Sequence, residues 1–372
     1  MLALLGIAYL LEGFLRALLG PLPQDLARRW LENAYFVRGI DSLDVYAGTR
    51  PVVPEIGVPH AGGYPPWSLP VALVVAPPVA HGFLQAYFAV LNVLALATVV
   101  WFARRAARRH GPLAANLVTA STAAIAANAV VLRNGQYGLL INAFLVGVLV
   151  ALETRHPLRA GAWLAIAALK PQSSGPFGLL LLDRRHWPGV FSAAAVLAVF
   201  AFGAASWLGS SPLHMLSQVF GQASNWEGGD AGPLRLLLAA GVPRGAAIAG
   251  LAGVVTIGSA ALLHVHRARS LLVQAAIACV GARLWAYHRR YDDVLLVFLL
   301  LPLALDALER STKAAWVAFV AVGLTLWLPL REVDHGVALI ALKVVVWGIG
   351  LCVLLRSPYG RPEAVPSPAR SE

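Results

Sequence analysis

Long apolar runs separated by short polar segments make up most of the chain. The runs are rich in Leu, Ala, Val and Gly, and they lack the strict alternation of apolar and polar residues that marks a barrel strand. Several approach the roughly 20 residues that a helix needs to cross a hydrocarbon core about 30 Å thick. The pattern therefore predicts an all-α integral membrane protein, a polytopic bundle of membrane-spanning helices.

We expect about twelve crossings, the first of them near the N-terminus. They are predicted at about 2–20, 83–103, 113–133, 137–153, 159–171, 173–183, 188–208, 245–264, 270–287, 292–308, 314–330 and 335–355. The apolar piece 67–82 is interrupted by Pro77 and Pro78, so we expect a re-entrant or juxtamembrane element there. The alternative, that 67–82 crosses, would reverse the orientation of every later loop.

The basic residues support the arrangement in which 67–82 does not cross the membrane, because they gather in short clusters that would then all face the cytoplasm. These clusters are Arg104–Arg109, Arg155–Arg159, Arg184–Arg185, Arg267–Arg269, Arg310–Lys313 and the start of the tail at Arg356. We expect both termini in the cytoplasm of a bacterial cell and a single domain, 1–356, in its plasma membrane. Outer loops are predicted at 21–66 and 209–244, and a disordered tail at 357–372.

Composition agrees with a membrane protein, since 59% of the residues are hydrophobic and 13% are charged. Soluble domains average about 45–50% apolar and about 25% charged residues. The net charge of +11 does not indicate nucleic acid, because the basic residues follow the pattern of orientation signals; membrane lipids are the expected surroundings. Cys279 and Cys352 lie in apolar runs without metal-ligand spacing, which argues against a disulfide framework or a zinc site.

The long first outer loop carries the first candidate catalytic residues, Asp41 and Asp44 in the segment IDSLDVY. A carboxylate in a partly dry pocket can have a raised pKa and act as a general base toward a sugar hydroxyl. The alternative is that these residues only form turns. Upstream of them, PQDLARRWLENAYFVR has apolar residues at amphipathic spacing, so it predicts a helix along the membrane interface.

Cationic residues follow at two later places on the same predicted face. Lys170 ends a short helix before Pro171, and His288, Arg289 and Arg290 open a crossing. Positive charge on the outer side opposes the orientation bias, so we predict that these groups hold an anion such as a phosphate. The alternatives are snorkelling of Lys170 to the headgroups and internal pairing of the arginines with Asp292 and Asp293.

A polar turn, RNGQY at 133–137, separates two predicted crossings. Gly135 can adopt a left-handed conformation there, and Gln136 can bond hydroxyl groups. A simple hairpin turn would have a similar sequence.

Several common motifs are absent from the sequence: a Walker loop, GxGxxG, GxSxG and HExxH. Nucleotide-driven transport, nucleotide-sugar binding by a Rossmann domain, serine hydrolysis and zincin chemistry therefore lack their usual elements. If the protein is a transferase, its donor is expected to be carried by a lipid. We predict no cofactor, with a divalent metal as the remaining alternative.

The order of the polar motifs resembles glycosyltransferase family 87, the integral-membrane mannosyltransferases of the GT-C superfamily. The resemblance spans about residues 35–310 and rests on Asp41, Asp44 and Tyr46, then Tyr64-Pro65-Pro66, Asn134-Gly135-Gln136, Lys170-Pro171, and Tyr287-His288 with Tyr291-Asp292. It implies a single-step, inverting transfer of a sugar, usually mannose, from a polyprenyl-phosphate sugar to a glycolipid or polysaccharide acceptor.

Carried onto this chain, the resemblance gives the role of base to Asp41 or Asp44, with Asp41 preferred. Lys170, His288, Arg289 and Arg290 are the expected phosphate ligands. The expected contacts of the sugar or acceptor are His60, Tyr64, Asn134, Gln136, Tyr291 and Asp292. The competing functions are a transporter or flippase for lipid-linked sugars, which should show an internal repeat, and a structural membrane protein.

Overall fold

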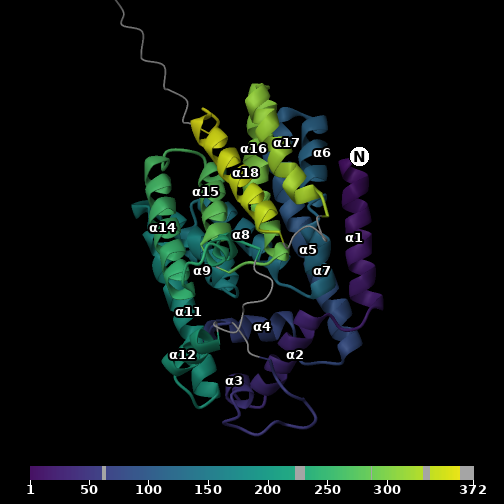
Figure 1. Ribbon diagram of the computed structural model, residues 1–372, viewed down its shortest axis with the longest axis vertical. Helices are drawn as coiled ribbons and strands as arrows, with labels where there is room; N and C mark the ends of the chain where they lie inside the picture. The colour runs from purple at the N-terminus through teal and green to yellow at the C-terminus, as the bar shows by residue number, and fades with distance from the viewer. Residues whose placement is uncertain (61–63, 223–230, 286, 330–335, 361–372) are drawn as a thin grey trace, which may run out of the picture.

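The computed structural model describes residues 1–60, 64–222, 231–285, 287–329 and 336–360, and within them all the regular secondary structure is helical, with no strand (Figure 1). Five helical segments are long and apolar enough to cross a membrane, and a bent pair would make six among the described residues. The five segments contain α1 (Leu2–Leu19), α5 (His81–Ala107), α11 (Trp187–Trp207), α14 (Arg244–Val265) and α18 (Val337–Arg356). The bent pair is α6 (Pro112–Ala123) and α7 (Ala127–Asn134), which meet at 44°.

The core of the bundle is formed by shorter helices that are buried on nearly every side. They are α8 (Gly138–Glu153), α15 (Leu271–Leu284) and α16 (Val297–Arg310), and α17 (Lys313–Trp327) covers α16. The structure is that of a polytopic helical membrane protein, but it has fewer helices of spanning length than the twelve crossings that the sequence predicts.

The segment around Lys170 shows why the number is lower. The runs expected to cross at 159–171 and 173–183 form α9 (Pro157–Ala167), of 11 residues, and the 3₁₀ helix η3 (Gly175–Leu182), of 8 residues. At 1.5 Å per residue for an α-helix and 2.0 Å for a 3₁₀ helix, each is only about 16 Å long, half of a hydrocarbon core. The chain turns back through α10 (Pro171–Ser174) inside the bundle, so Lys170 lies at the tip of this turn, 4% exposed.

One end of the bundle gathers the basic clusters, as their distribution along the sequence predicts. Arg105 pairs with Glu153 at 3.0 Å and Arg109 with Glu309 at 2.8 Å, which joins the ends of α5, α8 and α16. The N-terminus lies at this end too (Figure 1). The short 3₁₀ helices η2 (Arg108–His110) and η4 (Arg184–His186) carry further basic residues.

Residues 357–360, expected as the start of a disordered tail, pack against this basic end. Ser357 donates a hydrogen bond to Asp306 at 2.5 Å, and the carbonyl of Tyr359 accepts from the Arg269 guanidinium. The rest of the expected tail, 361–372, lies outside the described residues.

The opposite end is closed by short helices that lie across the bundle (Figure 1). They are α2 (Gln24–Phe36), α3 (Ser42–Tyr46), the 3₁₀ helix η1 (Pro66–Ser68), α4 (Leu69–Val75) and α12 (Pro212–Gln222), and α13 (Pro233–Ala239) lies against α18. With η1, α4 makes a helical piece of 10 residues, about 15 Å long and too short to cross.

The predicted amphipathic helix is present as α2, but its buried side is partly polar. Asn33 donates to the carbonyls of Ala72 and Ala76 at 3.0 and 2.8 Å, which satisfies the last turn of α4. Arg29 and Glu32 are buried as well, at 8% and 6% exposed. The helix therefore turns charged groups toward the bundle instead of toward water.

Candidate active site

A small cavity of about 30 Å³ lies between α2, α3 and η1. We call it the carboxylate cavity, because Asp41 and Glu32 line it. Asp41 caps the N-terminus of α3, where its Oδ1 accepts from the backbone N–H of Leu43 at 2.9 Å. Its Oδ2 is buried without a hydrogen-bond partner in the described part of the chain. Burial raises the pKa of the Asp41 carboxyl above its usual value.

Glu32 is the second carboxylate on the cavity, and it was not among the residues expected from the sequence. One of its oxygens accepts from the Arg29 guanidinium, and the other, Oε1, is buried without a hydrogen-bond partner among the described residues. Burial outweighs the attraction of Arg29 and raises the pKa of Glu32 to about 7. Asp25, Arg29 and Glu32 recur at helical spacing in the sequence, which is the signal that could have placed them on one face.

Asp44 occupies a different environment from Asp41, although the two are three residues apart. Its Oδ1 accepts from Gln218 of α12 at 2.6 Å, and its Oδ2 lies 3.6 Å from the Arg50 guanidinium. The cavity lining does not include Asp44. Its contacts therefore tie α3 to α12, and of the two candidate bases Asp41 is the one that faces the cavity.

Tyr64 lines the same cavity from a position two residues before η1. The Arg29 guanidinium lies 4.3 Å from the centre of its ring, and the ring meets Tyr137 edge to face at 5.8 Å. His60, which the sequence groups with Tyr64, is exposed and is absent from the cavity lining. The structure thus brings Tyr64, but not His60, together with Asp41.

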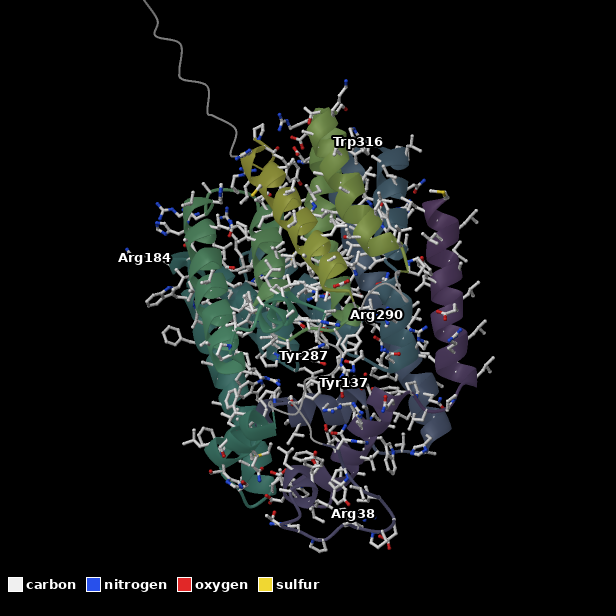
Figure 2. The ribbon with its side chains drawn as sticks, viewed as in Figure 1. Arg38, Tyr137, Arg184, Tyr287, Arg290 and Trp316 are labelled. Carbon is white, nitrogen blue, oxygen red and sulfur yellow. The ribbon has the colours of Figure 1, made fainter. Side chains whose placement is uncertain are left out.

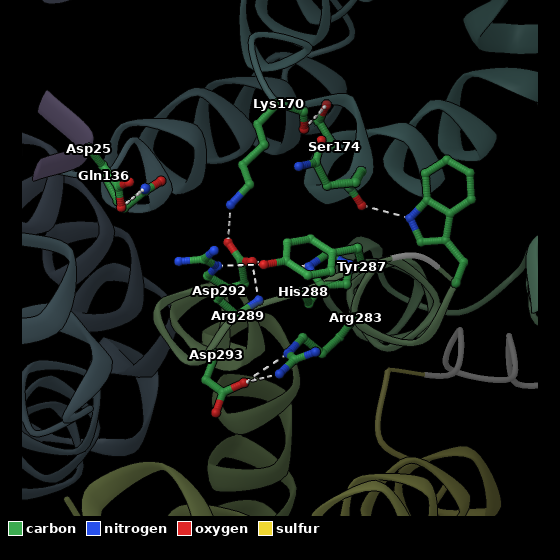
Figure 3. Close-up of polar contacts among 12 residues, drawn as sticks. Asp25, Gln136, Lys170, Ser174, Arg283, Tyr287, His288, Arg289, Asp292 and Asp293 are labelled. Atoms are coloured by element: carbon green, nitrogen blue, oxygen red, sulfur yellow. Dashed lines mark hydrogen bonds and ion pairs between the residues drawn. The ribbon is translucent and has the colours of Figure 1, made fainter. Parts of the chain in front are cut away.

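Lys170, His288, Arg289 and Asp292 form a second cluster, the Asp292 cluster (Figure 3). Lys170 pairs with Oδ1 of Asp292, His288 Nδ1 lies 3.3 Å from Oδ2, and the backbone N–H of Arg289 donates to Oδ2 at 3.0 Å. The ammonium of Lys170 also lies 4.7 Å from the ring of Tyr291. Residues from distant segments meet here, and the anion that Lys170 and His288 contact is a carboxylate of the protein itself.

The two arginines after His288 point to different places. The side chain of Arg289 donates to the hydroxyl of Tyr287, beside the Asp292 cluster. Arg290 lines a separate cavity of about 50 Å³ with Lys343 and Asp293. Asp293 is held there by Arg283 at 2.8 Å and by Lys343 at 3.4 Å. Arg290 is therefore not part of the Asp292 cluster.

The turn at 133–137 connects α2 to the rest of the bundle. Gly135 has a left-handed φ of +69°, as its sequence position predicts, and an added Cβ would lie 2.5 Å from the Cβ of Leu26 in α2. Gln136 donates to Asp25, also in α2 (Figure 3). Asn134 ends α7, half-buried, and lines neither of the two cavities described above.

The carboxylate cavity and the Asp292 cluster are neighbours. Tyr64 lines the cavity and is close enough to Asp292 to be affected by its charge. Tyr137 and Tyr287 lie in the same part of the molecule, inward from the short helices (Figure 2). In the described residues, no three His, Cys, Asp or Glu side chains are grouped so that they could hold a metal ion.

A family model described as glycosyltransferase family 87 matches residues 63–312 of the chain. The match includes Tyr64, Lys170 and the whole Asp292 cluster, and it begins C-terminal to Asp41 and Glu32. No curated protein and no solved structure is significantly similar to the chain.

Proposed function

The chain belongs to glycosyltransferase family 87 and is therefore a membrane glycosyltransferase, and from this premise we propose its reaction. The donor is a polyprenyl-phosphate sugar, with mannose as the expected sugar, and the acceptor is a glycolipid or a polysaccharide. The reaction takes place at the outer face of a bacterial plasma membrane. Family membership favours this enzyme over the alternative of a transporter or flippase.

The proposal rests on the position of Asp41 at the carboxylate cavity. Asp41 is 4% exposed, lines a cavity and has one carboxylate oxygen without a hydrogen-bond partner in the described part of the chain. A buried carboxylate with a raised pKa is suited to take a proton from a hydroxyl group. In the proposed step, Asp41 accepts the hydroxyl proton of the acceptor while the acceptor oxygen bonds to the anomeric carbon.

The bond between the anomeric carbon and the phosphate oxygen breaks in the same step, and the sugar is inverted. Negative charge then grows on the departing polyprenyl phosphate. The Asp292 cluster can offset this charge, because Lys170 and Arg289 bring two positive charges against the single carboxylate of Asp292. Arg289 is half-buried beside Tyr287, which leaves its guanidinium near the surface that a lipid phosphate would approach.

Asp292 has a supporting role in this scheme. It holds Lys170 and His288 in place, so that the ammonium group is oriented before the donor binds. Tyr64 and Tyr291 are proposed to contact the sugar, since Tyr64 lines the carboxylate cavity and Tyr291 lies beside Lys170 of the Asp292 cluster. No cofactor is part of the proposed reaction.

The test is a transfer assay with purified protein in lipid vesicles, a polyprenyl-phosphate sugar and candidate lipid acceptors. The parent should form product, and Asp41→Asn should lower the rate by about 100-fold or more, the usual contribution of a general base. Asp44→Asn is the comparison, expected to lower the rate by less than about tenfold through its contact with α12. Equal activity of Asp41→Asn and parent would contradict the assignment of the base, and no product from the parent would contradict the proposed reaction.

A further inference from the structure

The carboxylate cavity contains one more acid than a single general base requires. Asp41 and Glu32 line it from two separate segments, and each has one oxygen that is buried and without a hydrogen-bond partner in the described residues. Buried polar atoms in proteins are almost always hydrogen-bonded, so two such carboxylates lining one cavity indicate that it receives a polar group. The volume of about 30 Å³ is enough for one hydroxyl group or one water molecule.

The charges around the cavity do not neutralise both acids. Glu32 is faced by Arg29, by the more distant Arg28 and by Asp41, and Tyr64 is the other titratable group on the cavity wall. Asp41 is faced by Asp44, His214 and Arg50, none of which lines the cavity. Because Arg29 contacts Glu32, the two carboxylates together hold more negative charge than the adjacent cation offsets. Glu32, whose pKa is about 7, can therefore hold a proton at neutral pH.

We propose that Glu32 is a second acid–base residue of the active site, which takes the proton from Asp41 after each transfer and returns Asp41 to its carboxylate form. This inference rests on the proposed function. It assigns to Glu32 a role that repeated turnover requires, since Asp41 must lose its proton before the next acceptor hydroxyl can be activated.

The proton moves through the group that occupies the cavity. The O–H bond of protonated Asp41 breaks as Asp41 donates to a water molecule between the two acids, and that water donates one of its own protons to Glu32. Glu32 becomes neutral, which leaves Arg29 as the positive partner of the Tyr64 ring. Water at the outer face later takes the proton from Glu32, so no oxidant, reductant or other co-reactant is needed.

The pH dependence of transfer separates this role from a purely structural one. In the parent, the rate should rise with pH through about 7, because an ionised Glu32 is the form that accepts the proton. Glu32→Gln should lower kcat by about 10- to 100-fold and remove this rise, whereas Glu32→Asp should keep it. Glu55→Gln is the matched control, because it alters an exposed carboxylate in the same predicted outer loop, 21–66. This variant should keep both the rate and the pH profile of the parent.

Because Glu32→Gln leaves Arg29 buried without its partner, the double variant Arg29→Gln with Glu32→Gln is measured alongside it. Infrared titration of the parent adds a readout that does not depend on activity: the carbonyl band of a protonated carboxyl should vanish as the pH rises through about 7, and it should be missing from both variants.

The outcomes are distinguishable. If the parent transfers sugar but both variants keep its rate and pH profile, the inference is overturned and the proposed function stands. The inference is likewise overturned if the infrared band is unchanged by the loss of Glu32. If the parent transfers no sugar from any lipid-borne donor, the proposed function and the role of Glu32 fall together.

Discussion

The carboxylate cavity and the Asp292 cluster are two neighbouring groups of buried charges, and they differ in whether their carboxylates have hydrogen-bond partners within the protein. Asp292 is held by three groups, from Lys170, His288 and the backbone of Arg289. In the cavity, Asp41 and Glu32 each keep one buried oxygen that bonds to nothing in the described part of the chain. The carboxylate of Asp292 is satisfied within the protein, and the two carboxylates of the cavity are not.

The difference separates a carboxylate that orients the cations around it from two carboxylates that can receive a hydroxyl group directly. A buried carboxylate with all its partners organises the side chains around it, and its loss leaves cations uncompensated. A buried carboxylate with an unbonded oxygen costs stability and persists where it has another use, such as the binding of a hydroxyl group.

The largest effect is expected from Asp292→Asn. The change leaves Lys170 and His288 buried without their anion, and removing one partner of a buried ion pair typically costs about 3–5 kcal/mol. Thermal unfolding in detergent should show a large loss of stability, with Glu55→Gln unchanged as the exposed control. A variant with parent-like unfolding would contradict the stabilising role of the ion pair between Lys170 and Asp292.

A smaller effect is expected from Gly135→Ala, which acts where the turn at 133–137 packs against α2. Alanine at a φ of +69° is strained by about 1–2 kcal/mol, and its Cβ would lie 2.5 Å from Leu26, so α2 must shift. Because α2 carries Glu32 and Arg29, we expect transfer to fall more than thermal stability does. The control is Gly111→Ala, where the φ of +90° also brings backbone strain but no atom lies within 4 Å of the added Cβ.

If the two alanine variants lose transfer equally, the contact of α2 with the turn at 133–137 does not matter for the site. A loss confined to Gly135→Ala would instead show that the position of α2 controls the cavity.

A more gradual effect is expected in the pH dependence of stability. The pKa of Glu32 is about 7 in the folded protein and 4.5 when unperturbed, so the folded state binds more protons between these values. Stability is therefore highest on the acidic side of this window and falls as the pH rises through it, by at most about 1.4 kcal/mol per pH unit. Glu32→Gln should remove this slope in thermal unfolding measured at several pH values across the window. A parent without the slope would show that Glu32 is ionised throughout.

The sequence predicted several local features that the structure contains. The apolar runs predicted helices, and PQDLARRWLENAYFVR predicted the helix that became α2. Gly135 adopts its expected left-handed turn because no other residue takes that conformation at so little cost. The grouping of the basic clusters at one end also follows from their place between the apolar runs.

Other features depended on contacts that no local pattern contains. The runs around Lys170 have the composition of crossings, yet α9 and η3 are too short to cross, because Pro171 interrupts the helix in the interior of the bundle. The sequence leaves Asp41 and Asp44 as alternative bases with Asp41 preferred, and the packing of α12 against α3 gives a partner to Asp44 and leaves Asp41 on the cavity.

By itself, the sequence determined the helical membrane class and the basic end of the bundle, since each follows from residues close together in the chain, and it determined the family to which the chain belongs. The tertiary structure alone decided which buried charges are satisfied. Lys170 and Asp292 are 122 residues apart, a separation that no local period can encode. The partners of a buried charge are set by how distant segments pack, and this packing leaves Asp41 and Glu32 facing the same cavity.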